Sequence, residues 1–237
     1  MAGVISERQE IGVIDSINNH HALVGKPFNI LSGEVTIKDV IRAEKFGGRS
    51  SAGTEPYTDV IITTKRGKVN ISNKGTSAPS IAGGGLAGLE LAVPGFSGKF
   101  LNKALQELVS RGFKDGDPIP DVYGKVSDSL KELIVVGNAS MGGPIDYMYI
   151  GPMDVKGTKN GNNLILNGKF YAAKKYAKTH DLYLRLRKRR NDQPFDTKSK
   201  DKFGYPLILG KSPSRGDTGR RIVTVTKPPA NAIVVEF

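Results

Sequence analysis

Three polar residues occupy matching places in what reads as a β-hairpin. Asp59 begins the first strand, and Ser72 and Lys74 end the second. The start of one hairpin strand lies beside the end of the other, and residues two apart on a strand share a face, so the three side chains are expected to converge. A carboxylate that holds Mg²⁺, next to a lysine that orients water or stabilises developing charge, can hydrolyse a phosphodiester. The spacing therefore predicts metal-assisted cleavage of a nucleic-acid backbone.

This Asp59…Ser72-x-Lys74 pattern resembles the (P)D…(D/E)-x-K signature of the restriction-endonuclease-like superfamily. The resemblance covers roughly residues 35 to 91. It implies a central mixed sheet flanked by helices, a Mg²⁺ cofactor that Mn²⁺ could replace, and catalytic roles for the three residues. The function that it implies is a Mg²⁺-dependent endonuclease that hydrolyses DNA.

Two positions depart from the superfamily signature. Thr58 rather than proline precedes the aspartate, and Ser72 stands where Asp or Glu is usual. Members with Ser-x-Lys complement the site with a glutamate from the next helix, for which Glu90 is the match. Members also carry a helix glutamate upstream of the hairpin, for which Glu44 and Glu10 are the matches. The resemblance thus implies Glu90, Glu44 or Glu10 as the second metal ligand and leaves the choice among them open.

Other motifs compete for the chemistry. The stretch Asp146…Asp154-x-Lys156 has both carboxylates and the lysine, but its arms are short and Gly-Pro steps interrupt it, so it is the second candidate site. The glycines of G-x-G-x-x-G over 83–88 follow no buried strand and lie in no βαβ unit, which disfavours a dinucleotide site. Residues 20 and 21 are adjacent histidines that do not share a helix face, so a surface helix end is favoured over zinc binding.

The positive charge of the chain is concentrated in its C-terminal third. The chain carries +12 overall, whereas residues 156–221 hold 18 Lys and Arg against 5 Asp and Glu, a net +13, which leaves −1 elsewhere. A one-sided basic region favours a polyanion, with nucleic acid first, although a solvated basic face is the plainer alternative. The residues predicted to bind phosphates are Arg185, Arg187, Lys188, Arg189, Arg190, Lys211, Arg215, Arg220 and Arg221. Such contacts give affinity and little sequence information.

Composition excludes several classes of protein. The chain has no cysteine, which rules out disulfides, thiolate metal sites and a cysteine nucleophile, and it fits a reducing cytoplasm. No apolar run approaches the roughly 18 residues of a membrane span, and the N-terminus lacks the features of a secretory signal. The Gly-rich style with short β elements looks phage-like. We therefore expect a cytoplasmic protein without a membrane partner, encoded by a phage and acting in the host cell.

Hydrophobic periodicity predicts a mixed α+β fold. The predicted helices cover residues 6–19, opened by a Ser6-Gln9 capping box, then 36–46, 99–111, 127–133 and 171–178, with 20–34 as a connection and a short helix near 86–91. The predicted strands cover residues 59–64, 69–73, 134–136, 147–150, 163–166, 182–187, 222–225 and 233–235. The length favours a single domain over 1–237, with a nuclease-like core over 1–155 and a basic β-rich extension over 156–237 packed on it.

Two functions from different classes remain. The first is the Mg²⁺-dependent endonuclease, acting on duplex DNA more readily than on single strands and expected to be a homodimer if it cuts both strands. The second is a non-catalytic nucleic-acid-binding or phage structural protein that keeps the fold and has lost the site, which the serine at position 72 favours. The sequence does not separate DNA from RNA.

Overall fold

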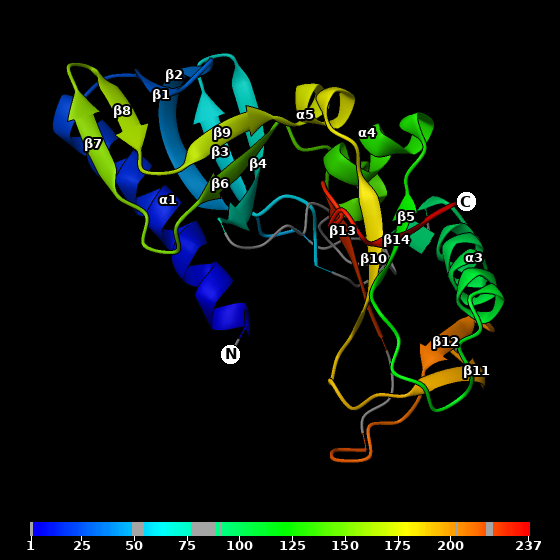
Figure 1. Ribbon diagram of the computed structural model, residues 1–237. Coiled ribbons are helices and arrows are strands. Elements are labelled where there is room, and N and C mark those ends of the chain that lie inside the picture. The colour runs from blue at the N-terminus through cyan, green and yellow to red at the C-terminus, as the bar shows by residue number, and fades with distance from the viewer. Residues whose placement is uncertain (1, 49–54, 77–88, 91, 202, 217–219) are drawn as a thin grey trace. The chain divides into compact units, whose positions relative to one another are not determined.

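A mixed sheet carries the predicted hairpin. The computed structural model describes residues 2–48, 55–76, 89–90, 92–201, 203–216 and 220–237. The strands of the sheet are β1 Phe28–Ser32, β2 Val35–Lys45, β3 Val60–Thr64, β4 Gly67–Gly75, β6 Tyr147–Gly151, β7 Gly157–Asn160, β8 Asn163–Leu166 and β9 Lys169–Ala172. Their order is β7-β8-β1-β2-β3-β4-β6-β9, with β1–β8 and β4–β6 parallel (Figure 1). The α/β class with a central mixed sheet is confirmed, and so is the β3–β4 hairpin.

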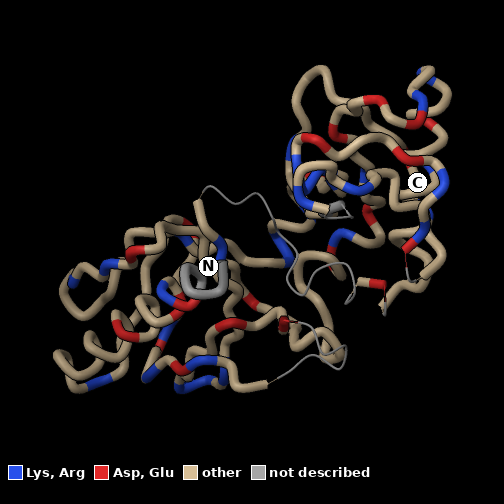
Figure 2. The backbone as a smooth tube through the Cα atoms, turned by 90° about the horizontal axis from the view of Figure 1, so that it is seen from below, with Lys and Arg blue, Asp and Glu red and all other residues tan. Residues whose placement is uncertain are grey.

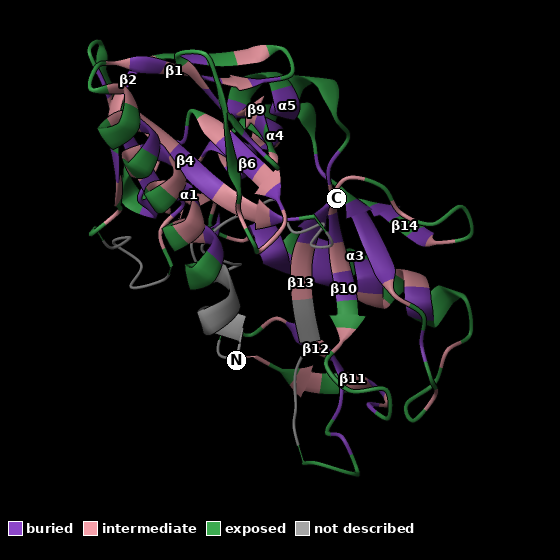
Figure 3. Cartoon of the chain, turned by 90° about the vertical axis from the view of Figure 1, so that its left-hand side faces the viewer, coloured by how far each residue is buried: buried purple, intermediate pink, exposed green. Residues whose placement is uncertain are grey.

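Helix α1, Ala2–Val24, packs on one face of this sheet. Its buried positions are spaced three or four residues apart, as one face of a helix requires, and are Gln9, Val13, Ile17 and His20. The sheet residues that meet it are apolar and buried (Figure 3). The helix begins well before Ser6, so the predicted capping box is wrong, and it runs past Asn19 into the segment predicted as a connection.

The segment predicted as a helix from Thr36 is the strand β2, so this prediction is wrong. The pairing of β2 shifts register twice, once between Ile37 and Val40 and once between Val40 and Arg42, and each shift inserts one residue. Asp39, in the first shift, has a left-handed φ of 57°. The insertions place the buried residues at 37, 40 and 43, a spacing of three that imitates a helix.

The chain divides into two compact units, Met1–Gly84 with Glu132–Thr179 and Gly85–Lys131 with His180–Phe237. These boundaries differ from the predicted subdivision at residue 155. The second unit contains α3 Phe96–Ser110 and the strands β5 Val122–Lys125, β10 Tyr183–Lys188, β11 Phe195–Lys200, β12 Pro206–Leu209, β13 Arg220–Val225 and β14 Ile233–Glu236. Its four-stranded sheet has the order β13-β10-β5-β14, and β11 pairs with β12. The helix predicted over 99–111 and the strands predicted near 182, 222 and 233 are confirmed.

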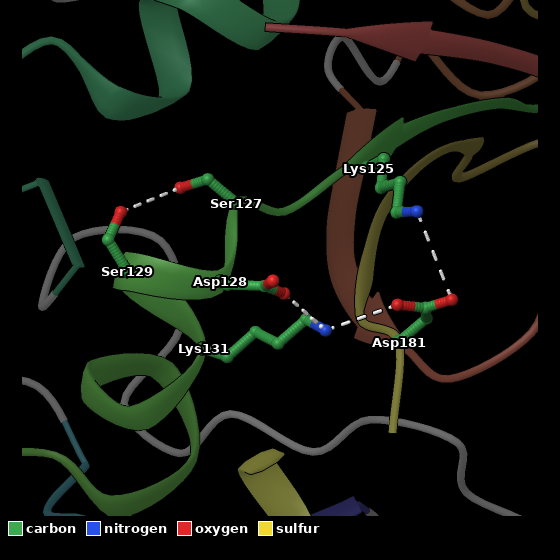
Figure 4. Close-up of polar contacts among 6 residues, drawn as sticks. All are labelled: Lys125, Ser127, Asp128, Ser129, Lys131 and Asp181. Atoms are coloured by element: carbon green, nitrogen blue, oxygen red, sulfur yellow. Dashed lines mark hydrogen bonds and ion pairs between the residues drawn. The ribbon is translucent and has the colours of Figure 1, made fainter. Parts of the chain in front are cut away.

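One division of the chain between the units falls within helix α4, Asp128–Val136. Helix α5, Ala173–Thr179, belongs to the first unit. The predicted strand over 134–136 is wrong, because these β-branched residues form the buried last turn of α4. At the start of α4, buried Lys131 contacts Asp128 at 2.7 Å and Asp181 at 3.1 Å (Figure 4). This lysine is therefore a structural cation. Among the described helices, none combines the length and apolar character that crossing a bilayer requires.

Candidate active site

Asp59 is fixed at the open end of the β3–β4 hairpin. Its backbone N–H donates to Ile71 O at 2.8 Å, and its carbonyl accepts from Phe46 N at 2.9 Å, so both neighbouring strands hold it. Ser72 Oγ donates to Asp59 Oδ2 at 3.1 Å, and the Asn73 backbone N–H donates to the same oxygen at 2.6 Å. The predicted convergence of Asp59 and Ser72 is thus present, and two donors set the orientation of the carboxylate.

Lys74 and the Asp59 carboxylate attract each other electrostatically. Burial lowers the pKa of the Lys74 ammonium, while the charges of Asp59 and Glu55 raise it. Burial in turn raises the pKa of Asp59, and Lys74 acts in the opposite direction. The backbone carbonyl of Lys74 accepts a hydrogen bond from Gln9 Nε2 at 3.2 Å, which ties this end of β4 to α1. Burial disfavours the charged forms of both Lys74 and Asp59, whereas the opposite charge of each favours the charged form of the other. This pair forms the centre of the site.

Glu10 is the upstream glutamate that the fold brings toward Asp59. Its side chain projects from α1 and is 12% exposed. Burial raises the pKa of Glu10 most, and the negative charge of Asp59 raises it further, while Lys45 lowers it. Glu44 instead pairs with Arg42 at 3.6 Å and is 40% exposed. Of the two upstream candidates, Glu10 is therefore the one whose charge is coupled to Asp59.

Glu90 has a full set of partners within the second unit. Its carboxylate accepts from the backbone N–H groups of Gly95 at 2.5 Å and Ser97 at 3.0 Å, from the Ser97 hydroxyl, and from Tyr205 Oη at 2.7 Å. Burial raises the pKa of Glu90, but these hydrogen bonds outweigh it and the pKa is lowered. Because Gly95 is the N-cap of α3, the glutamate satisfies the free donors at a helix start. These contacts account for Glu90 as a capping residue.

The backbone N–H of Asn73 donates to Asp59, but the side-chain amide of Asn73 has no hydrogen-bond partner among the described residues. Both its polar atoms, Nδ2 and Oδ1, are buried and make no hydrogen bond within the described part of the chain. Buried polar atoms in folded proteins are nearly always paired, so an unpaired amide needs an explanation. An amide carbonyl is a suitable oxygen ligand for a hard cation or for its bound water. No group of three or more His, Asp or Glu side chains among the described residues is arranged to hold a metal ion.

The second candidate site is not assembled. Asp146 comes directly before β6, and Asp154 follows the end of the strand, so the length of β6 separates them. Asp146 Oδ2 accepts from the Asn70 backbone at 2.8 Å, and Asp154 pairs with Arg8 at 3.2 Å. The exposed Lys156 shares neither contact. The prediction of a joint Asp146, Asp154 and Lys156 site is therefore wrong.

The predictions for the histidine pair and for the glycine motif have different outcomes. His20 is 3% exposed, and its ring packs edge-on against Phe28 with centroids 4.5 Å apart. Burial lowers the pKa of His20. The prediction of a surface position is thus wrong for this histidine, which belongs to the core. The G-x-G-x-x-G motif over 83–88 lies outside the residues that the structure describes.

The predicted phosphate-binding residues fall into two groups in the second unit. Arg185 donates from Nε to Asp121 Oδ2 at 2.9 Å, and its guanidinium lies 5.8 Å from the centre of the Tyr123 ring. It is therefore already neutralised. The exposed members are Arg187, Arg189, Arg190, Lys211 and Arg215, with Lys188 half-buried. The β10–β13 register pairs Arg187 with Arg221 and Lys188 with Arg220. Figure 2 shows the positions of Lys and Arg along the backbone in blue.

Exposed basic residues of the second unit are expected to bind nucleic acid through counterion release. The triple change Arg187→Ala, Arg189→Ala and Lys211→Ala should weaken DNA binding and reduce the slope of log K against log salt by up to about 0.9 per lost contact. Fluorescence anisotropy over a salt series measures both. The control removes three exposed lysines of the first unit, Lys38, Lys65 and Lys68. Equal weakening by the two triple variants would mean that net charge alone matters.

Sequence patterns do not indicate three of the residues that lie at the site. Gln9 reads as part of a capping box, yet it donates to Gly151 O at 2.8 Å and to Lys74 O. Lys45 lies in the segment misread as a helix. Asn73 is the unspecified middle residue of Ser-x-Lys, and nothing in the surrounding sequence indicates that its amide is buried.

Replacing Glu10 by glutamine should stabilise the fold in a pH-dependent way. The pKa of Glu10 is raised above 4.5 in the folded chain, so the ionised carboxylate opposes folding as the pH rises through the folded value. Glu10→Gln is expected to raise Tm by roughly 2–4 °C near neutral pH, with the gain disappearing below about pH 4. Thermal unfolding across pH measures this, with the exposed Glu7→Gln as control. A gain that grew toward acid pH would contradict the assignment.

Comparison with known proteins gives no relative for this chain. No family model matches it, and neither a curated protein nor a solved structure does. No substrate or ligand set can therefore be transferred from a relative.

Proposed function

We propose that this protein is a metal-dependent endonuclease that hydrolyses phosphodiester bonds in duplex DNA. The observation that carries the proposal is the meeting of Asp59, Ser72 and Lys74 at one end of the sheet, with Glu10 electrically coupled to the aspartate. Carboxylates whose pKa values are raised by burial, beside a lysine whose pKa is lowered, are typical of functional sites. This arrangement suits the attack of water on a phosphodiester.

The donors at the site fit Mg²⁺. Mg²⁺ is usually held by one or two carboxylates, with waters and substrate phosphates completing its shell. Asp59 and Glu10 would supply the carboxylates. When bound, the metal would polarise the phosphate and lower the pKa of water. Mn²⁺, which accepts the same oxygen donors, is expected to replace it.

The protein's own residues then divide the remaining work. Ser72 and the Asn73 backbone hold Asp59 Oδ2, so the carboxylate does not need to reorganise. Lys74 orients the attacking water or stabilises the charge that develops on the phosphate. The exposed basic residues of the second unit bind the DNA backbone without reading its sequence.

Plasmid cleavage tests the proposal directly. Supercoiled DNA is incubated with the protein and Mg²⁺, Mn²⁺ or EDTA, with single-stranded DNA and RNA as parallel substrates. The expected result is nicked and linear plasmid with either metal and intact plasmid with EDTA. Intact plasmid with every metal, on substrates that include genomic DNA of varied sequence, would refute the nuclease.

A non-catalytic nucleic-acid-binding protein is the second candidate. The observation that favours it is Ser72, which stands where a carboxylate is usual and uses its hydroxyl to satisfy Asp59. With this function, Asp59 would be a structural acceptor for the hairpin. Salt-sensitive DNA binding without cleavage, together with no binding of Mn²⁺, would support this alternative.

A further inference from the structure

Lys45 bridges two glutamates of α1 next to the proposed site. It is the last residue of β2, and its Nζ lies 3.1 Å from Glu7 Oε1 and 3.3 Å from Glu10 Oε2. The two glutamates differ in environment, because the Glu7 side chain is 54% exposed and that of Glu10 is 12% exposed. One ammonium is thus shared between a partner in solvent and a partner at the site.

The charges at the site balance without a metal ion. In their ionised forms Asp59 and Glu10 carry two negative charges, and Lys74 and Lys45 carry two positive charges. A divalent cation bound by the two carboxylates would bring the sum to about +2, so it has to compete with the Lys45 ammonium for Glu10. Glu7 already contacts that ammonium and can keep it when Glu10 binds the cation.

We propose that Lys45 is an exchangeable counter-cation that is shared by Glu10 and Glu7 in the metal-free protein and keeps only Glu7 when a divalent cation binds. This inference rests on the proposed metal-dependent function. Lys45 lowers the metal affinity of the site, and the negative phosphates of bound DNA offset this cost. Metal binding is consequently coupled to substrate binding, and Lys45 acts through Glu10 rather than on the substrate.

Direct binding of Mn²⁺ in the absence of DNA tests this role. Free Mn²⁺ is measured by electron paramagnetic resonance for the wild type, Lys45→Met, Glu7→Gln and the control Lys38→Met, which removes an exposed lysine of the same strand. Lys45→Met is expected to bind Mn²⁺ about two- to fivefold more tightly, the range that ion pairs of this exposure contribute. Glu7→Gln should bind more weakly, because Lys45 then stays on Glu10, and Lys38→Met should match the wild type.

The outcomes separate the inference from the proposed function. Wild-type binding and cleavage, with Lys45→Met no tighter than Lys38→Met, would overturn the role of Lys45 and leave the nuclease intact. Absence of Mn²⁺ binding at millimolar concentrations in both wild type and Lys45→Met would overturn both. Circular dichroism and Tm of each variant establish that the fold is kept before the affinities are compared.

Discussion

Asp59→Asn is expected to lower metal-dependent DNA cleavage about 100- to 1000-fold or more, while DNA binding stays equal or becomes tighter. In the wild type, Ser72 and the Asn73 backbone donate to Asp59 Oδ2. The amide keeps the shape of the side chain, and its oxygen can still accept from these two donors. It loses the negative charge that a divalent cation needs. Removing a negative charge near phosphates also removes repulsion, so affinity for DNA should not fall. Initial rates on plasmid and anisotropy on a short duplex measure the two effects.

Asp146→Asn is the matched control for this change. Asp146 also accepts a backbone N–H of β4, from Asn70 at 2.8 Å, but it precedes β6, on the opposite side of β4 from β3, and is exposed. We expect it to keep full cleavage and Mn²⁺ binding. If both variants lose cleavage equally, or if Asp59→Asn loses DNA binding along with cleavage, the division of roles between the site and the basic surface is wrong.

The part of the site that sequence predicts is its local part. Asp59, Ser72 and Lys74 lie within one hairpin, and strand pairing alone brings them together. Glu10 comes from α1, and only the packing of that helix on the sheet separates it from Glu44 as the partner of Asp59. The choice between them depends on contacts far apart in sequence, which no spacing rule encodes.

The errors in the predicted fold have similar physical causes. In β2, inserted residues turn an alternating pattern into a spacing of three, so a strand imitates a helix. In α4, the run Ile134, Val135 and Val136 favours a strand by propensity, but full burial of these side chains outweighs that preference. The two units interleave along the chain, so no single point in the sequence divides them.

Lys74→Ala is expected to reduce cleavage about 100- to 1000-fold while Mn²⁺ binding stays equal or becomes tighter, which distinguishes it from the loss of metal binding in Asp59→Asn. Lys74 is not a proposed metal ligand, so the substitution removes only its effect on the attacking water or on the charge that develops on the phosphate. The control is Lys68→Ala, an exposed lysine at the other end of the same strand. Equal loss in the two lysine variants would show that the chemistry does not depend on position 74.

The pH dependence of cleavage then chooses between the two roles of Lys74. Burial lowers the pKa of its ammonium, and a bound divalent cation would lower it further because like charges repel. The neutral amine, which can accept a proton from water, therefore becomes more populated as the pH rises through this lowered value. We expect the wild-type rate to rise over that range and Lys74→Arg to be as inactive as Lys74→Ala, since arginine stays protonated. If Lys74→Arg kept most of the activity at all pH values, the lysine would act by its charge, and burial would serve only to strengthen that charge's field at the phosphate.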